Sequence, residues 1–160
     1  MRDAARAGLS VAPTLMASAA AAIHAPSRAL DWKNDMEPEE NNLMVFVTHG
    51  PKAPERCATP FYMASVACAM DGKATLVFQI DGVLLMKKGV AEDLRALEGG
   101  KLIIDFIREA KEAGVEFYCC SAALQLHNMT EADLIEECNG VVGAAWMMDK
   151  AGDANVVLTY

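Results

Sequence analysis

Short apolar runs alternate with helix-like segments along residues 43–160, and this alternation limits the fold more than any other feature of the chain. The runs have the length of strands and cover residues 43–50, 73–80, 115–120 and 154–160. Continuous apolar runs of this kind are typical of parallel strands that lie between two layers of helices. The pattern therefore predicts an α/β fold, a three-layer, flavodoxin-like domain with a mainly parallel sheet of about five strands.

The segments between these runs carry helix signals. Thr59 followed by Pro60 resembles an N-cap with proline at the first helical position. Thr130 and Asp133 resemble a capping box with Asp in place of Glu. Helices are expected over residues 60–72, 99–114, 121–128, 130–137 and 141–152.

Three of the predicted strands end in residues that could carry chemistry. In a parallel sheet the carboxyl ends of the strands share one edge, and ligands bind beyond that edge. The residues there are Thr48-His49-Gly50, Asp81-Gly82 and Cys119-Cys120. Turn formation is the favoured interpretation of the Gly and Asp positions, which leaves the two cysteines as the main candidates.

Charge and composition argue against several classes of protein. The net charge of the 160 residues is -8 and no basic stripe is visible, so nucleic acid is not expected as a partner. No stretch reaches the roughly 18 to 20 strongly apolar residues of a membrane span. Five cysteines, an odd number without framework spacing, argue against a secreted disulfide scaffold and favour a cytoplasmic location.

Residues 1–42 differ in composition from the rest of the chain. Residues 1–30 are rich in alanine and have the outline of a signal or transit peptide, although alanine makes the apolar run weak. Residues 31–42 are polar, and Met36 would be a natural start for a cytoplasmic α/β domain. We expect residues 1–42 to be a leader and linker outside the domain, and residues 43–160 to form the domain.

The adjacent Cys119 and Cys120 fall at the predicted boundary between a strand and a helix. Strand side chains alternate between faces, so one cysteine should pack and the other should lie at the strand tip. Cys120 directly precedes the predicted helix, whose free N–H groups would stabilise a thiolate. Cys120 is therefore the candidate nucleophile and Cys119 its packed neighbour. On the residues alone, two buried structural cysteines are an equally good interpretation.

Other cysteine chemistries are disfavoured. Neither Cys-x2-Cys nor His-x3-His occurs, which argues against a zinc site and a thioredoxin-type redox motif. A cysteine protease would need a base held on the thiol, and nothing in the sequence places His49 or His127 there. A nucleotide-binding domain should show a phosphate-binding loop, and "THGPKAPER" contains no such glycine pattern.

Several segments resemble the DsrE/DsrF/TusD-like sulfurtransferase family. They are "VFVTHGPKAPERCATPFYMASVACAM", "ATLVFQIDGVLLMKKG", "GVEFYCCSAAL" and "ADLIEECNGVVGAAWMMDKAGDANVVLTY". The resemblance covers roughly residues 43–160 and rests mainly on the order of these motifs. It implies a small α/β protein that carries sulfane sulfur as a cysteine persulfide, in sulfur oxidation or in a relay for tRNA thiolation.

The resemblance also implies a site and partners. In TusD-like members the sulfur-carrying cysteine ends a strand before an Ala-Ala-Leu helix start, which matches Cys120 in "CCSAAL". Cys119 departs from that pattern, and its role stays open. Donor and acceptor proteins (TusA-like or rhodanese-like carriers) and a homo-oligomer are expected, without metal or organic cofactor. A sulfurtransferase is favoured, and the alternative is a non-catalytic structural or regulatory subunit of the same fold.

Overall fold

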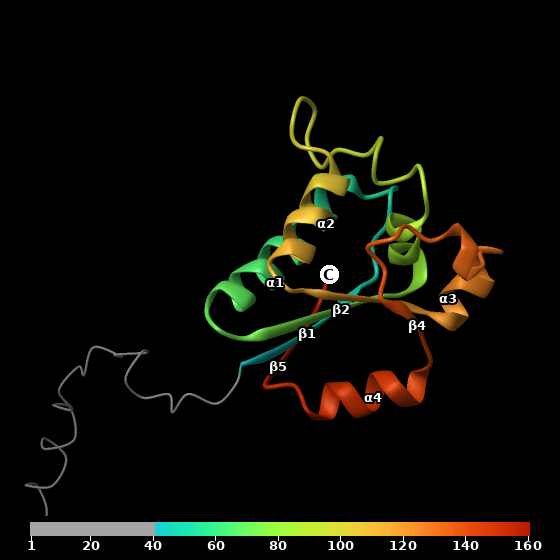
Figure 1. Ribbon diagram of the computed structural model, residues 1–160. Coiled ribbons are helices and arrows are strands. Elements are labelled where there is room, and N and C mark those ends of the chain that lie inside the picture. Colours follow the sequence, from blue (N-terminus) through green and yellow to red (C-terminus); the bar gives the residue numbers. More distant parts are fainter. Residues whose placement is uncertain (1–40) are drawn as a thin grey trace, which may run out of the picture. The chain divides into compact units, whose positions relative to one another are not determined.

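The computed structural model describes residues 41–160, which form a five-stranded parallel sheet in the order β4-β3-β2-β1-β5. In Figure 1, helices α1 and α2 lie on one face of this sheet and α4 lies on the opposite face. The predicted three-layer, flavodoxin-like α/β fold is therefore confirmed. The strands are β1 (Asn42–Val47), β2 (Lys73–Phe78), β3 (Glu116–Cys120), β4 (Gly140–Val142) and β5 (Val156–Thr159). The helices are α1 (Thr59–Ala69), α2 (Ile103–Glu112), α3 (Ser121–Leu126) and α4 (Ala144–Gly152).

Aromatic side chains from three elements form the centre of the core between the sheet and α1. Phe61 of α1, Phe78 of β2 and Phe117 of β3 are fully buried, and each pair of ring centroids lies 6.0 Å apart. On the opposite face, the Tyr118 ring lies 4.6 Å from the Trp146 ring of α4. Residues 117 and 118 thus point to opposite faces, as strand geometry requires.

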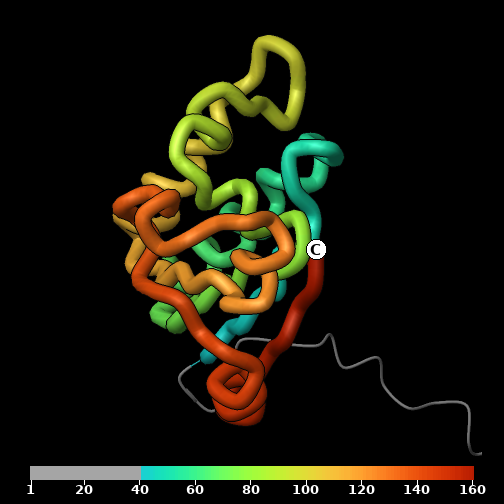
Figure 2. The backbone as a smooth tube through the Cα atoms, turned by 90° about the vertical axis from the view of Figure 1, so that its right-hand side faces the viewer, coloured from blue at the N-terminus to red at the C-terminus, as the bar shows by residue number. Residues whose placement is uncertain are grey.

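The loops that follow β1 and β2 cross so closely that two positions require glycine. A Cβ atom at Gly50 would lie 2.1 Å from the carbonyl oxygen of Asp81, and one at Gly82 would lie 2.1 Å from that of Val47. Both distances are shorter than any van der Waals contact. Figure 2 shows the end of the chain beside the segment that follows β1, where the Thr48 amide donates a hydrogen bond to the Tyr160 carbonyl.

Several element boundaries differ from the predicted ones. Helix α1 includes Thr59, whose side chain makes no capping bond because the N-cap is Ala58. The predicted helix over 141–152 was wrong at its start, because residues 140–142 extend the sheet as β4 and α4 begins at Ala144. The expected helix over 130–137 is one 3-10 turn, Glu131–Asp133, although the Thr130–Asp133 capping box is present. Two further 3-10 segments cover Pro54–Arg56 and Ile80–Met86, the latter in place of a simple turn at Asp81-Gly82.

The proposed leader and linker, residues 1–42, fall almost entirely outside the residues that the structure describes. Within residues 41–160, no helix is long and apolar enough to cross a membrane.

Candidate functional site

The two adjacent cysteines lie where β3 passes into α3. Cys120 is the last residue of β3 and the N-cap of α3, with φ -72° and ψ 125°. Its side chain is 9% exposed, whereas Cys119 is completely buried. Cys119 pairs with Phe78 of β2 and Val141 of β4, so it sits inside the sheet, and Cys120 closes the strand at its carboxyl end.

A third cysteine, Cys138, lies against Cys119. The Sγ atom of Cys138 is 3.6 Å from the Sγ atom of Cys119, and its thiol also lies near the carbonyl oxygens of Phe117 and Gly140. Cys138 is only partly buried. Sequence reasoning did not identify it, because its position depends on β4, a three-residue strand that was interpreted as the start of a helix. A strand assignment for "GVV" would have placed the residues before it beside β3.

The contact between the two sulfurs shifts their pKa values in opposite directions. The pKa of Cys138 is lowered to about 7, mainly by the hydrogen bond with Cys119. A backbone hydrogen bond with Gly140 and the positive charge of Lys111 also lower this pKa, whereas burial raises it. The hydrogen bond with Cys138, and then burial, raise the pKa of Cys119 far above its ordinary value. At neutral pH the proton therefore stays on Cys119, and Cys138 is the sulfur that ionises.

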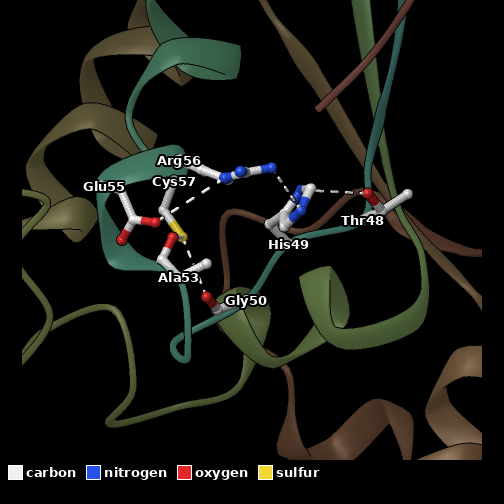
Figure 3. Close-up of polar contacts among 7 residues, drawn as sticks. All are labelled: Thr48, His49, Gly50, Ala53, Glu55, Arg56 and Cys57. Atoms are coloured by element: carbon white, nitrogen blue, oxygen red, sulfur yellow. Dashed lines mark hydrogen bonds and ion pairs between the residues drawn. The ribbon is translucent and has the colours of Figure 1, made fainter.

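The end of β1 forms a separate polar cluster, which Figure 3 shows. His49 is bonded through Nε2 to Arg56 at 3.2 Å and through Nδ1 to the Thr48 hydroxyl at 3.4 Å. These residues, with Glu55, Thr59, Thr159 and Tyr160, line an open hollow of about 370 Å³. The buried Cys57 thiol donates to the carbonyl oxygens of Gly50 and Ala53. Burial, followed by the charge of Glu55, raises the pKa of Cys57 to about 11, which marks it as a packing residue.

His127, the C-cap residue of α3, lies against the segment that follows β2. His127 Nε2 lies 3.0 Å from the carbonyl oxygen of Ile80 and 3.2 Å from the Asp81 carboxylate. Ile80 has a φ of +50°, an uncommon conformation for a β-branched residue. Among the hydrogen bonds of residues 41–160, neither His49 nor His127 is bonded to a cysteine, so no base is held on a thiol. The described residues also hold no group of three His, Cys, Asp or Glu side chains suited to a metal ion.

Comparison with known proteins identifies the family of this chain. Residues 41–160 match the DsrE/DsrF-like family. The chain belongs to this family. The match spans all of the residues that the structure describes.

Individual relatives of this DsrE-like chain are distant. The chain is 28% identical over 116 residues to the uncharacterized protein MJ0760 of Methanocaldococcus jannaschii. The aligned region covers 72% of this chain and 42% of that protein. The chain thus spans less than half the length of this relative. The ychN protein from E. coli has a TM-score of 0.63 at 14% identity, covering 75% of this chain and 99% of that one. MTH1491 from Methanobacterium thermoautotrophicum has a TM-score of 0.54 at 14% identity, with the same coverage of both chains. These two likenesses show a shared fold.

Proposed function

We propose that this protein carries sulfane sulfur as a persulfide on Cys120 and passes it to a partner protein, in sulfur oxidation or in a sulfur relay. The observation that carries the proposal is the position of Cys120 in a DsrE-like chain, at the end of β3 and directly before "SAAL" of α3. The location proposed for the protein is the cytoplasm, where the five free thiols would stay reduced.

The chemistry is two successive thiol exchanges. The Cys120 thiolate attacks the outer sulfur of a donor persulfide, the S–S bond of the donor breaks, and the donor thiolate leaves. An acceptor thiolate then attacks the outer sulfur on Cys120, and Cys120 leaves as a thiolate. No electrons are gained or lost overall, since the sulfane sulfur only changes its carrier.

Burial determines which partners suit this site. Because Cys120 is 9% exposed, a donor must reach a recessed sulfur, for which the cysteine of a TusA-like or rhodanese-like carrier protein is suited. We also propose a homo-oligomer. Large apolar side chains remain exposed on α1 and β5, among them Tyr62, Met63, Val66, Val156 and Val157, and surfaces of this kind are commonly covered by another subunit.

Intact-mass measurement after treatment with a polysulfide tests the proposal. The reduced chain should gain about 32 Da for each sulfur atom taken up by a thiolate, and fragmentation after alkylation should locate that sulfur on Cys120. Cys120→Ser should lose the stable gain, whereas Cys57→Ser, Cys68→Ser and Cys138→Ser should keep it. In Cys119→Ser, loading should persist, and slower release would show that Cys119 attacks the persulfide.

The burial of both adjacent cysteines favours a second candidate function. Cys119 at 0% and Cys120 at 9% exposure are as buried as the core of the domain, which suits a structural or regulatory subunit without sulfur chemistry. If the unchanged chain holds no sulfur on Cys119 or Cys120, this second function replaces the first.

A further inference from the structure

Cys119 and Cys138 form a pair of thiols that the carrier role of Cys120 does not use. Their Sγ atoms lie 3.6 Å apart although the residues are 19 positions apart in the chain. A disulfide has an S–S distance of about 2.0 Å, so closing the bond requires a shift of roughly 1.5 Å. Cys119 is fully buried and Cys138 is partly exposed, so a small molecule reaches the pair through Cys138.

Hydrogen bonds on both sides of Cys138 hold its sulfur at this position. The Asn139 amide donates to the Phe117 carbonyl at 2.7 Å, and the Phe117 amide donates to Asn139 Oδ1 at 2.8 Å. Lys111 Nζ donates to the same Asn139 oxygen at 2.7 Å. On the other side, the buried Glu137 accepts a hydrogen bond from Arg108 at 3.0 Å. The hydrogen bonds that join residues 137–139 to β3 and α2 thus also fix the position of the Cys138 sulfur beside Cys119.

The charges around the pair give the two sulfurs different roles. Lys111 supplies a positive charge that favours a Cys138 thiolate, and Cys119 shares a hydrogen bond with that sulfur. The partly exposed Cys138 is therefore the attacking sulfur. Cys119 keeps its proton and is available for a second step.

We propose that Cys119 and Cys138 form a dithiol site that reduces the sulfane sulfur of small persulfides or polysulfides to hydrogen sulfide. This activity goes beyond sulfur carriage, and Cys120 takes no part in it.

The reaction has two steps. In the first, the Cys138 thiolate attacks the outer sulfur of R–S–SH, the S–S bond of the donor breaks, and R–S⁻ leaves and takes up a proton. In the second, the Cys119 sulfur attacks the inner sulfur of the Cys138 persulfide. The proton of Cys119 passes to the departing hydrosulfide, which leaves as H₂S, and the Cys119–Cys138 disulfide forms. The sulfane sulfur gains two electrons and each cysteine sulfur loses one. A small external dithiol then restores both thiols.

The test uses the full chain with Cys120→Ser, so that sulfur on Cys120 is absent from the readout. The reduced protein is treated with glutathione persulfide, and released sulfide and intact mass are measured together. We expect about one equivalent of sulfide per chain and a loss of about 2 Da, with a Cys119–Cys138 cross-link in the peptide map. Further addition of Cys68→Ser, on α1, should leave all three results unchanged.

Variants of the pair separate this activity from the carrier role. Cys138→Ser in the same background should release at least tenfold less sulfide and form no cross-link. Cys119→Ala should stop at a stable gain of about 32 Da on Cys138, because the attacking thiol of the second step is gone. Circular dichroism shows whether the Cys119→Ala variant folds, since Cys119 is buried. If this variant does not fold, the Cys138→Ser variant tests the proposal by itself, because Cys138 is partly exposed.

Two results would overturn the proposal: a stable persulfide on Cys138 while Cys119 is intact, or sulfide release that persists without Cys138. Neither depends on Cys120. Conversely, failure of the chain with intact Cys120 to hold sulfur on that residue would refute the carrier function alone.

Discussion

Arg108 Nε donates a 3.0 Å hydrogen bond to the Oε1 atom of Glu137, a carboxylate whose side chain is 10% exposed. The pair joins the exposed face of α2 to the segment that carries Cys138. A buried carboxylate that loses its partner still carries the free-energy cost of its desolvation. This contact therefore contributes more to the stability of the fold than an ion pair on the surface does.

Arg108→Ala is therefore expected to lower the free energy of unfolding, but by less than the loss of a fully buried pair would, because the Arg108 side chain is more than half exposed. Urea denaturation measures this loss. Glu109→Ala on the same helix is the control, because its partner Lys101 and Glu109 itself are both exposed, and it should cost no more than about 0.5 kcal/mol. Equal losses in the two variants would show that Glu137 is solvated in solution.

The reactivity of Cys138 should depend on pH near neutrality. Its pKa is lowered to about 7 from the ordinary 9.0, and the thiolate is the reactive form, so alkylation by iodoacetamide should rise with pH and reach half of its maximum near pH 7. Cys57, with its pKa raised to about 11, should stay unmodified at pH 8. Quantitative mass spectrometry of the two peptides follows both reactions.

Lys111 tests the cause of this pH dependence. The titratable and charged groups facing Cys138 are Lys111 from α2 and Cys119 and Tyr118 from β3. Lys111→Ala removes a positive charge that stabilises the thiolate, so the midpoint of alkylation should move to higher pH. Lys111→Arg keeps the charge and should keep the midpoint close to that of the unchanged chain. A midpoint unaffected by Lys111→Ala would show that the charge of Lys111 adds nothing to the hydrogen bond with Cys119, which is the largest cause.

The crossing of the loops after β1 and β2 should tolerate no side chain. Gly82→Ala places a Cβ atom 2.1 Å from the Val47 carbonyl oxygen, and we expect a loss of more than about 3 kcal/mol in the free energy of unfolding. Gly152→Ala, at the end of α4 with nothing within 4 Å of the added atom, should change it by less than about 1 kcal/mol. Thermal unfolding followed by circular dichroism compares the two variants.

The apolar groove between α1 and β5 is expected to lie in a subunit contact. Its lining includes Met63, Val66, Met70 and Val156 around a volume of about 220 Å³. Light scattering should show a homo-oligomer for the unchanged chain, and Val66→Glu should reduce its mass, because a charge in a covered apolar surface is costly. Leu97→Glu changes a side chain that is 75% exposed, outside this groove, and should leave the mass unchanged. A monomer at micromolar concentration before any substitution would contradict the expectation.

Sequence reasoning reached the parallel sheet and the strand–helix boundary at Cys120 because both depend on local patterns. The apolar runs that became β1, β2 and β3 are buried through contacts that any layered fold would supply. The run that became β5 forms an edge strand and stays largely exposed. Cys120 stands between an apolar run and a helix start, and that position can be read without knowing what packs around it.

The tertiary structure decided what the thiols contact. Strand β4 has three residues and too short a pattern to distinguish it from a helix start, and it forms only because β3 offers an edge with free hydrogen-bonding groups. That pairing brings Cys138 to within 3.6 Å of Cys119 across 19 residues. The depressed pKa of Cys138 arises from the same assembly, because Cys119 and Lys111 reach it from β3 and α2. The local pattern determined where Cys120 stands in the chain, whereas the pairing of Cys119 with Cys138 required long-range strand contacts that no local pattern encodes.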